Sequence, residues 1–317
     1  MKKIVQQIFD WYPDDFVLKK RPSIDLQSND LYDLIKDNQR FILKAYLKAD
    51  ELEEAPRREF QALTLLEATD LAPKPIFFNP QAGPFVIYEF MKGEMWDRKR
   101  PSSSQLTELA DAWLTINAVQ NEQHWLARGS QHPIRFQWVR KMFHEYSAWL
   151  ETAVYADKAT IKRLNQSLQN IKPIFQKIAE TTPKRLFSRS DPRFANFIER
   201  PNGRLGMIDW EDSGWHDPAY ATADLLLHAN QEDLLTLNEW QPFLSPYFAE
   251  RTRTDPQFEQ RFAWYMAVLP FFWLGLFLKL SIIHHTNGTF DQWQINQLPA
   301  AERIENYWRW VERESIV

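Results

Sequence analysis

The sequence contains no cysteine among its 317 residues. Disulfide bonds, zinc sites built from thiolates and catalysis by a thiol are therefore excluded. The absence of cysteine is consistent with a reducing cytoplasm, which is the compartment we expect. The chain also lacks internal repeats and low-complexity tracts. Apolar residues make up 44% and charged residues 25% of the sequence, which is typical of a globular protein.

Neither sign of charge is in large excess, since 38 Lys and Arg face 42 Asp and Glu, for a net charge of −4. A mildly acidic chain lacks the positive charge typical of proteins that bind nucleic acid, so we expect no nucleic-acid partner. No long apolar segment follows the basic first residues, so we predict no secretory signal. The sequence leaves the oligomeric state open.

A run without charged side chains covers residues 262–278. A membrane-spanning helix needs about 20 apolar residues, and this run is slightly shorter. Pro270 interrupts the run and Lys279 ends it. We therefore expect a buried core helix, and the alternative is a membrane-embedded segment.

The first part of the chain alternates between short β-prone runs and turns. Strands are predicted at residues 16–18, 31–35, 41–46 and 84–90. The turn at residues 36–39 contains Asp37-Asn38 and predicts a β-hairpin. Residues 50–69 have apolar side chains at helical spacing, and two prolines end this helix at residues 73–75.

From residue 102 onward the sequence is mostly helical. Helices are predicted at residues 106–119, 135–155 and 161–178, the first of them starting near Ser104. A β-rich stretch follows, and Asp217-Pro218 then begins another helix, with Asp as the N-cap. This order predicts an α+β protein with a small lobe at residues 1–91, a helical lobe at residues 92–317 and a ligand cleft between them.

The stretch at residues 188–210 carries the residues with the clearest chemistry. Asp191 and Asn196 have the spacing D-x-x-x-x-N, and Asp209 follows a short apolar strand. Phosphoryl transfer from a nucleotide needs a carboxylate that orients or deprotonates the attacking hydroxyl, and it needs oxygen ligands for Mg²⁺. A loop with this spacing can present a base and a metal ligand together.

This stretch resembles the catalytic loop of aminoglycoside phosphotransferases and choline kinases, which reads H-x-D-x-x-x-x-N followed by I-D-W or I-D-F. The resemblance extends, with gaps, from about residue 16 to about residue 227. It implies a two-lobed protein-kinase-like fold with a β-rich small lobe and a larger α-helical lobe. It also implies ATP and Mg²⁺ as cofactors, Asp191 as the catalytic base, and Asn196 and Asp209 as metal ligands.

The resemblance also implies a nucleotide site in the small lobe. Ser28 and Asn29 lie where the family has its nucleotide loop. Lys44 lies where the family has its phosphate-binding Lys, and Glu59 where a helix Glu pairs with that Lys. Each has a structural alternative: an ordinary turn for Ser28 and Asn29, a solvated strand residue for Lys44, and a helix-surface charge for Glu59.

The hinge and the acceptor site follow from the resemblance as well. Residues 87–91 resemble the hinge that binds adenine through its backbone, which assigns Glu89 and Met91 to the nucleotide. Residues soon after the metal-binding Asp border the acceptor site in the family, and here they include Glu211, Asp212 and Trp215. Carboxylates beside an aromatic face can hold a cation. We therefore expect a cationic amino alcohol or an aminoglycoside-like acceptor, with a neutral sugar as the main alternative.

Two features depart from the family pattern. Arg189 and Ser190 replace the His and the usual Gly before the catalytic Asp, and a buried Arg at this place needs a partner. The loop at residues 25–30 contains no glycine. We therefore keep two hypotheses: an ATP-dependent phosphotransferase acting on a hydroxyl group of a small molecule, and a pseudokinase-like protein that binds a nucleotide or metabolite with little or no turnover.

Overall fold

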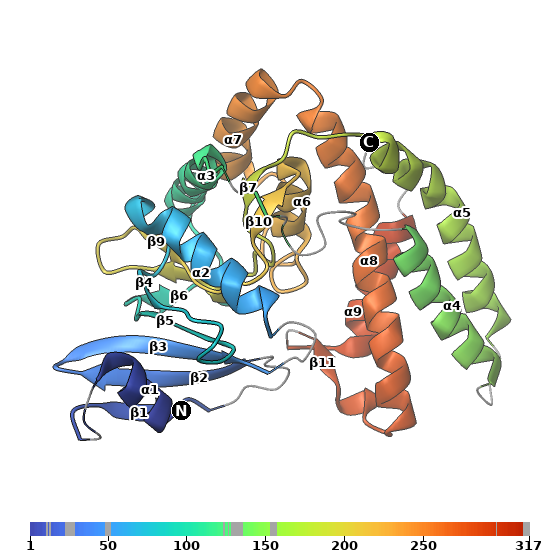
Figure 1. The fold of residues 1–317 in the computed structure, drawn as a ribbon. Coiled ribbons are helices and arrows are strands. Elements are labelled where there is room, and N and C mark those ends of the chain that lie inside the picture. Colours follow the sequence, from blue (N-terminus) through green and yellow to red (C-terminus); the bar gives the residue numbers. More distant parts are fainter. Residues whose placement is uncertain are drawn as a thin grey trace. The chain divides into compact units, whose positions relative to one another are not determined.

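The computed structural model describes the chain except for residues 11, 13, 23–28, 48–51, 123, 126, 128–135, 153–156, 296 and 313–317. The chain forms two compact units (Figure 1). Unit 1 comprises Met1–Arg128 and Leu186–Trp215, and unit 2 comprises Gly129–Arg185 and His216–Val317. Neither unit is one continuous segment, and the lobe boundary at residue 91 stays a prediction.

Unit 1 is built on a five-stranded antiparallel sheet with the strand order β1-β2-β3-β5-β4. Its strands are β1 Val17–Lys20, β2 Asn29–Lys36, β3 Gln39–Tyr46, β4 Pro75–Phe77 and β5 Phe85–Glu89. Asp37 and Asn38 join β2 to β3 with φ angles of 48° and 63°. Positive φ at both central residues is typical of a type I′ hairpin turn, so the predicted hairpin is confirmed.

Two helices pack on this sheet. Helix α1, Lys2–Phe9, brings Val5 into a core with Phe16, Leu34, Leu43, Phe85 and Ile87. Helix α2, Glu54–Leu66, continues into the short 3-10 helix η1, Glu67–Thr69. The buried face of α2 includes Ala55, Glu59, Ala62, Leu63 and Leu66, which recur at helical spacing. Glu59 therefore points away from solvent.

The rest of unit 1 surrounds the predicted catalytic stretch. Helix α3, Ser103–Ala118, begins at the N-cap Ser102, which forms a capping box with Gln105. The sequence predicts a start near Ser104, and this prediction was wrong because the N-cap is Ser102. The β-rich stretch is confirmed. Its elements are β7 Leu186–Ser188, η2 Phe194–Asn196, β8 Phe197–Glu199, β9 Leu205–Met207 and β10 Gly214–His216. Strand β6, Glu94–Met95, was not predicted and pairs with β8.

Unit 2 is mainly helical. Its helices are α4 Phe136–Thr152, α5 Lys158–Glu180, α6 Pro218–Leu227, α7 Gln241–Thr254, α8 Phe258–Thr286 and α9 Ala300–Glu312. Short elements lie between α8 and α9, namely η3 Phe290–Gln292, β11 Gln294–Ile295 and β12 Leu298–Pro299. Asp217 caps α6 by accepting a hydrogen bond from the Ala219 N–H, as the sequence predicts.

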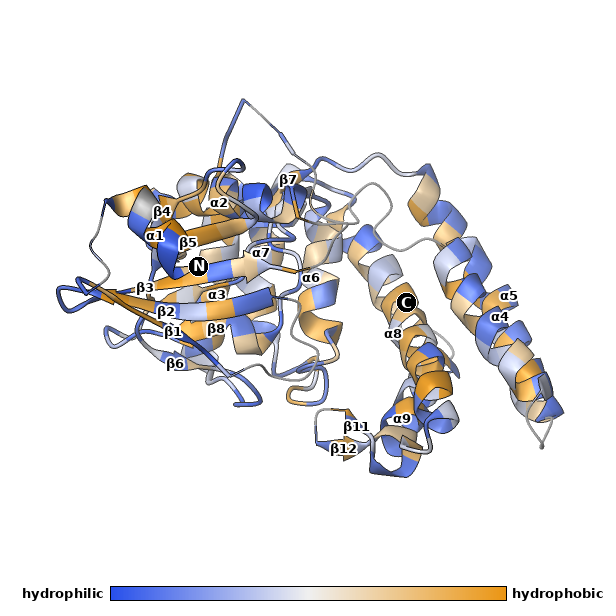
Figure 2. Ribbon diagram, turned by 60° about the horizontal axis from the view of Figure 1, so that its bottom comes forward, coloured by the Kyte–Doolittle hydropathy of each residue, from blue (hydrophilic) through white to orange (hydrophobic). Residues whose placement is uncertain are grey.

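Helix α8 contains the uncharged run. It packs against α4, α5, α6 and α9, and Figure 2 shows apolar residues along most of its length. It is long and apolar enough to cross a membrane, but 56% of its most apolar window is buried inside the protein. The buried Arg261 of α8 donates hydrogen bonds to Asp217 at 2.9 and 3.1 Å. These contacts are those of a core helix.

A buried ion pair anchors α9. Arg303 donates to the Ala229 carbonyl at 2.8 Å, pairs with Glu232 and lies 3.3 Å from Asp233. Burial raises the pKa of Glu232 to about 7, although the charge of Arg303 opposes the shift. The side chains of Arg303 and Glu232 are both almost completely buried, so each depends on the other for compensation of its charge.

Candidate active site

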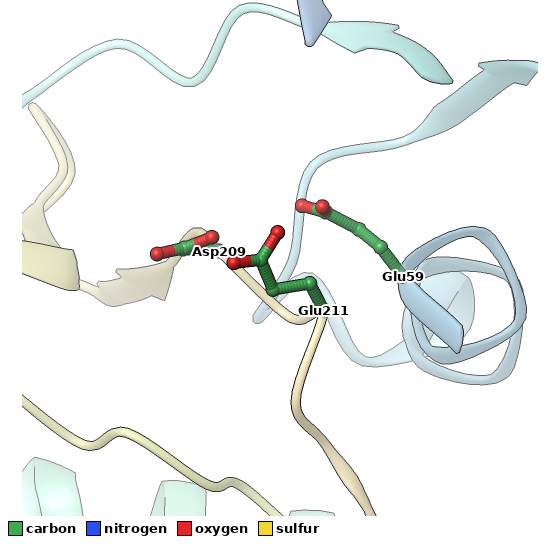
Figure 3. A group of neighbouring side chains, drawn as sticks. All are labelled: Glu59, Asp209 and Glu211. Carbon is green, nitrogen blue, oxygen red and sulfur yellow. The ribbon is translucent and has the colours of Figure 1, made fainter. Parts of the chain in front are cut away.

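Lys44 lies on β3 with its ammonium group among three carboxylates. Its Nζ is 2.8 Å from Glu59 Oε2 and 3.0 Å from Glu211 Oε2, and it also contacts Asp209 Oδ1. The residue is only 3% exposed, and a buried ammonium needs such partners. Figure 3 shows the three carboxylates converging from α2 and from the loop after β9. The structure thus confirms that Lys44 and Glu59 pair, as the resemblance implies.

Glu59 is fixed by contacts on both of its oxygens. Oε2 accepts hydrogen bonds from Lys44 and from the Tyr46 hydroxyl. Oε1 accepts a longer bond, at 3.4 Å, from the Trp210 backbone N–H. Since Trp210 directly follows Asp209, Glu59 connects α2 to the segment that carries the predicted metal ligand.

Asp209 follows β9 and adopts a left-handed backbone with a φ angle of 66°. Its Oδ2 accepts a hydrogen bond of 3.4 Å from Asn196 Nδ2, and the Ile208 N–H donates to the Asn196 carbonyl at 3.0 Å. Burial raises the pKa of Asp209, but the charge and the hydrogen bond of Lys44, together with the charge of Arg193, outweigh it, and the pKa is lowered overall. The two predicted metal ligands are therefore neighbours, and Asp209 is held in its ionised form.

Asp191 also lies in this group. Asn196 Nδ2 is 3.5 Å from the Asp191 carbonyl oxygen, and the charge of Asp191 raises the pKa of Asp209. The Asp191 side chain is 35% exposed, and Arg193 Nε lies 3.6 Å from its carboxylate. The carboxylate is thus accessible to a substrate, as a catalytic base must be, and its role as the base stays a prediction.

Glu211 joins the Lys44 group, although the sequence predicts it at the acceptor. Asn29, at the start of β2, donates to Glu211 Oε2 at 2.8 Å. Burial raises the pKa of Glu211 to about 7, against the opposing effect of Lys44. Ser28, which was predicted beside Asn29, lies outside the described residues. The structure therefore connects Asn29 to the cluster, whereas an acceptor role for Glu211 stays a prediction.

The carboxylate cluster that binds the Lys44 ammonium could also hold a divalent cation. Glu59, Asp209 and Glu211 each offer an oxygen, and these oxygens lie within 4.8 Å of one another (Figure 3). Carboxylate oxygens together with the amide oxygen of Asn196 form the hard donor set that Mg²⁺ prefers. Sequence analysis missed Glu59 and Glu211 as metal candidates. Their approach depends on the left-handed turn at Asp209, for which the sequence gives no signal.

The hinge residues lie in unit 1 as well. Glu89 ends β5 opposite Phe41 of β3, and its N–H donates to the Lys74 carbonyl at 2.9 Å. Met91 packs against Gly206 of β9, where an added Cβ would come 2.2 Å from the Met91 sulfur. The hinge therefore contacts the strand that leads to Asp209. Binding of adenine by Glu89 and Met91 stays a prediction.

The remaining residues predicted at the acceptor are held within unit 1. Arg58 donates to the Glu211 carbonyl at 2.8 Å and lies 4.0 Å from the Asp212 carboxylate. Trp215 is only 4% exposed and stacks on His124, with 4.4 Å between ring centroids. Packing accounts for the position of Trp215, and its contact with an acceptor stays a prediction.

Arg189 is buried, and one of its guanidinium nitrogens, Nη2, has hydrogen-bond partners, whereas Nε and Nη1 have none among the described residues. It donates hydrogen bonds to the backbone carbonyls of Ile208 and Asp209, at 2.7 and 3.1 Å. The residue that replaces the family His therefore contacts the segment that carries the predicted metal ligand.

Several solved structures are similar to this chain. Similar solved structures include the choline kinase LicA from Streptococcus pneumoniae, with 19% identity, 99% of each chain covered and a TM-score of 0.64. Plasmodium vivax ethanolamine kinase matches with 15% identity over 96% of this chain and 86% of that chain, and with a TM-score of 0.58. The complex of gentamicin with APH(2")-IIa matches with 15% identity over 99% and 96% of the two chains, and with a TM-score of 0.60.

These structural matches establish the fold, which is the α+β kinase-like fold that the sequence predicts. No curated protein sequence matches the chain. The model of the phosphotransferase enzyme family, however, matches residues 23–262, which include Lys44, Glu59, Asp191, Asn196 and Asp209. On this match, the chain belongs to the phosphotransferase enzyme family.

Proposed function

We propose that the protein transfers the γ-phosphoryl group of ATP to a hydroxyl group of a small molecule. The observation that carries this proposal is the meeting of Lys44, Glu59, Asn196 and Asp209, from four separate segments of one unit. Family membership supports a phosphotransferase. We also propose a cytoplasmic location, which the absence of cysteine supports.

The described contacts support a separate role for each residue in the proposed reaction. Glu59 orients Lys44, which would exchange its contact with Asp209 for the phosphate oxygens of ATP. Asp209 and Asn196 would hold Mg²⁺, with the carboxylates of Glu59 and Glu211 beside them. When bound, Mg²⁺ would neutralise charge on the phosphates. Asp191 would accept the proton of the attacking hydroxyl, and most of the rate enhancement would come from positioning and charge stabilisation.

We propose a cationic amino alcohol or an aminoglycoside-like compound as the acceptor. The similar structures are named as kinases of choline and ethanolamine and as a gentamicin complex. The Asp212 side chain keeps 21% of its surface exposed, so it can meet a cationic ligand. A neutral sugar is the alternative. The two differ in their response to salt, because salt weakens the binding of a charged acceptor to Asp212 and leaves a neutral one unaffected.

A second candidate function is nucleotide or metabolite binding with little or no turnover. Two observations favour it: three carboxylates engage Lys44 at once, and Arg189 replaces the family His. With three carboxylate contacts, the Lys44 ammonium group would not readily leave them to bind the phosphates of ATP. Such a protein would still bind ATP through the same residues, so binding alone does not separate the two functions.

Release of ADP from ATP and Mg²⁺ separates them. Purified protein is assayed with choline, ethanolamine, gentamicin and a neutral sugar, and we expect ADP release that depends on one acceptor. Asp209→Asn should abolish the release without changing the circular dichroism spectrum, whereas Asp212→Asn should raise only the acceptor KM. Thermal stabilisation by ATP without ADP release would support the second function, and the absence of both effects would contradict both proposals.

A further inference from the structure

Arg189 follows β7 directly and is only 1% exposed. A guanidinium buried without partners costs several kcal/mol, so its surroundings must compensate for its charge. Burial lowers the pKa of Arg189 to about 10, and the group therefore stays charged at neutral pH. The charges of Asp209, Asp191 and Glu59 favour the charged form, and the hydrogen bonds of Arg189 are to the Asp209 segment.

The hydrogen bonds of Arg189 flank the Asp209 Cα. The Nη2 nitrogen donates to the Ile208 carbonyl at 2.7 Å and to the Asp209 carbonyl at 3.1 Å. Hydrogen bonds from a charged donor contribute about 1.5–3 kcal/mol each. Asp209 itself has a φ angle of 66°, in a region that costs a residue with a side chain about 1–2 kcal/mol. An outside contact that fixes both carbonyls therefore stabilises the turn that directs the Asp209 carboxylate.

Two aromatic rings complete the environment. The guanidinium carbon lies 4.9 Å from the centre of the Trp210 ring and 5.7 Å from that of Phe197. Trp210 follows Asp209 in the sequence and Phe197 follows Asn196, so Arg189 touches a neighbour of each predicted metal ligand. Lysine keeps the charge, but it lacks the planar group that stacks on rings.

We propose that Arg189 is a positioning residue, which holds the backbone at Asp209 so that the Asp209 carboxylate is presented to a divalent cation. The inference rests on the proposed function for the identity of the metal ligand. In the resembled family a His occupies this place, whereas this chain has a permanently charged group there. The role differs from a general contribution to stability, because it predicts a change in metal affinity.

Binding of Mn²⁺ to the purified full chain tests this role without any turnover. Electron paramagnetic resonance of free Mn²⁺ gives the dissociation constant in the absence of nucleotide and acceptor. Residues that orient metal ligands typically change metal affinity by about 10–100-fold, so Arg189→Lys should raise the dissociation constant by this factor. Arg189→His should bind Mn²⁺ more tightly than Arg189→Lys, because the imidazole can again donate to one of the carbonyls.

Arg303→Lys is the matched control. Arg303 is equally buried and also donates to a backbone carbonyl, but it lies in unit 2. Its substitution should lower stability and leave the dissociation constant of Mn²⁺ at the wild-type value. Circular dichroism and urea unfolding establish that each variant is folded.

Three results would overturn the inference. A folded Arg189→Lys protein with wild-type affinity for Mn²⁺ would reject it and leave the proposed function standing. Unfolding of both Arg189 variants would assign the residue to the fold alone. A wild-type protein that does not bind Mn²⁺ would reject the proposed metal site together with the inference. Metal binding by the wild type without ADP release would instead reject only the proposed transfer.

Discussion

Replacing Glu211 by glutamine should stabilise the metal-free protein at neutral pH and weaken its response to Mg²⁺. Burial, together with the charges of Asp209 and Glu59, raises the pKa of Glu211 from 4.5 to about 7, and Lys44 offsets only part of this effect. Because the pKa is higher in the folded protein than in the unfolded chain, ionisation of Glu211 favours unfolding. The penalty is absent below the unfolded pKa, grows as the pH rises and is complete above about pH 7.

The size of the effect follows from the two pKa values. Raising a carboxyl pKa from 4.5 to about 7 disfavours the ionised folded form by at most about 3 kcal/mol. Glutamine stays neutral, and its amide oxygen can still accept the hydrogen bond that Asn29 donates. Glu211→Gln should therefore change the free energy of unfolding little near pH 4.5 and raise it by about 1–3 kcal/mol near pH 8.

Urea unfolding followed by tryptophan fluorescence measures this difference from about pH 5 to about pH 8, first with EDTA and then with Mg²⁺. Glu232→Gln is the matched control, since burial also raises the pKa of Glu232 to about 7 and the residue lies in unit 2. It should lower the free energy of unfolding with EDTA, because Arg303 loses its buried carboxylate partner, and it should leave the response to Mg²⁺ at the wild-type value. A Glu211→Gln protein that is no more stable than wild type near pH 8, or that keeps the full response to Mg²⁺, would refute the reasoning.

Three further substitutions test other parts of the molecule. Asp191→Asn should lower kcat by about 10²–10⁴-fold in the ADP-release assay and leave the circular dichroism spectrum unchanged; full activity would exclude Asp191 as the base. Lys44→Met leaves the buried Glu59 and Glu211 and the half-buried Asp209 without their cation, so urea unfolding at neutral pH should show a loss of about 3–5 kcal/mol. Calorimetric titration of the same variant should show weaker ATP binding. Gly93→Ala places a Cβ 2.3 Å from the Glu199 carbonyl oxygen, at a φ angle of 149°. We therefore expect the free energy of unfolding to fall by about 1–3 kcal/mol in the same urea assay. Wild-type stability would show that the strand pair β6–β8 can shift.

The sequence predicts most regular elements of unit 1 because their signals are local. The Asp37-Asn38 turn and the alternation on either side of it place β2 and β3, and helical spacing places α2. Helix α1 was not predicted. Its sequence is amphipathic, with Ile4, Val5, Ile8 and Phe9 at helical spacing, and these residues pack on the core of the sheet. The pattern that predicts this helix is therefore present in the sequence and was missed, because it spans only eight residues.

Some contacts of the site could likewise be predicted from the sequence, and others could not. Motif order correctly predicts that Lys44 and Glu59 pair and that Asn196 and Asp209 are neighbours. The position of Glu211 could not be predicted, because it depends on the backbone turn at Asp209 and on a hydrogen bond from Asn29, which is 182 residues away. The packing of Trp215 on His124 was equally hidden, since no short motif joins these two residues.

The ion pair between Arg303 and Glu232 limits where the chain can be shortened. The family match ends at residue 262, soon after α8 begins at Phe258, whereas Arg303 lies on α9. A fragment that ends at residue 262 would keep Glu232 and lose its cation, a change that typically costs about 3–5 kcal/mol. It would also uncover the apolar faces of α4 and α6 that α8 covers. The region matched by the family model therefore contains the proposed catalytic residues, but the last two helices supply buried contacts on which unit 2 depends.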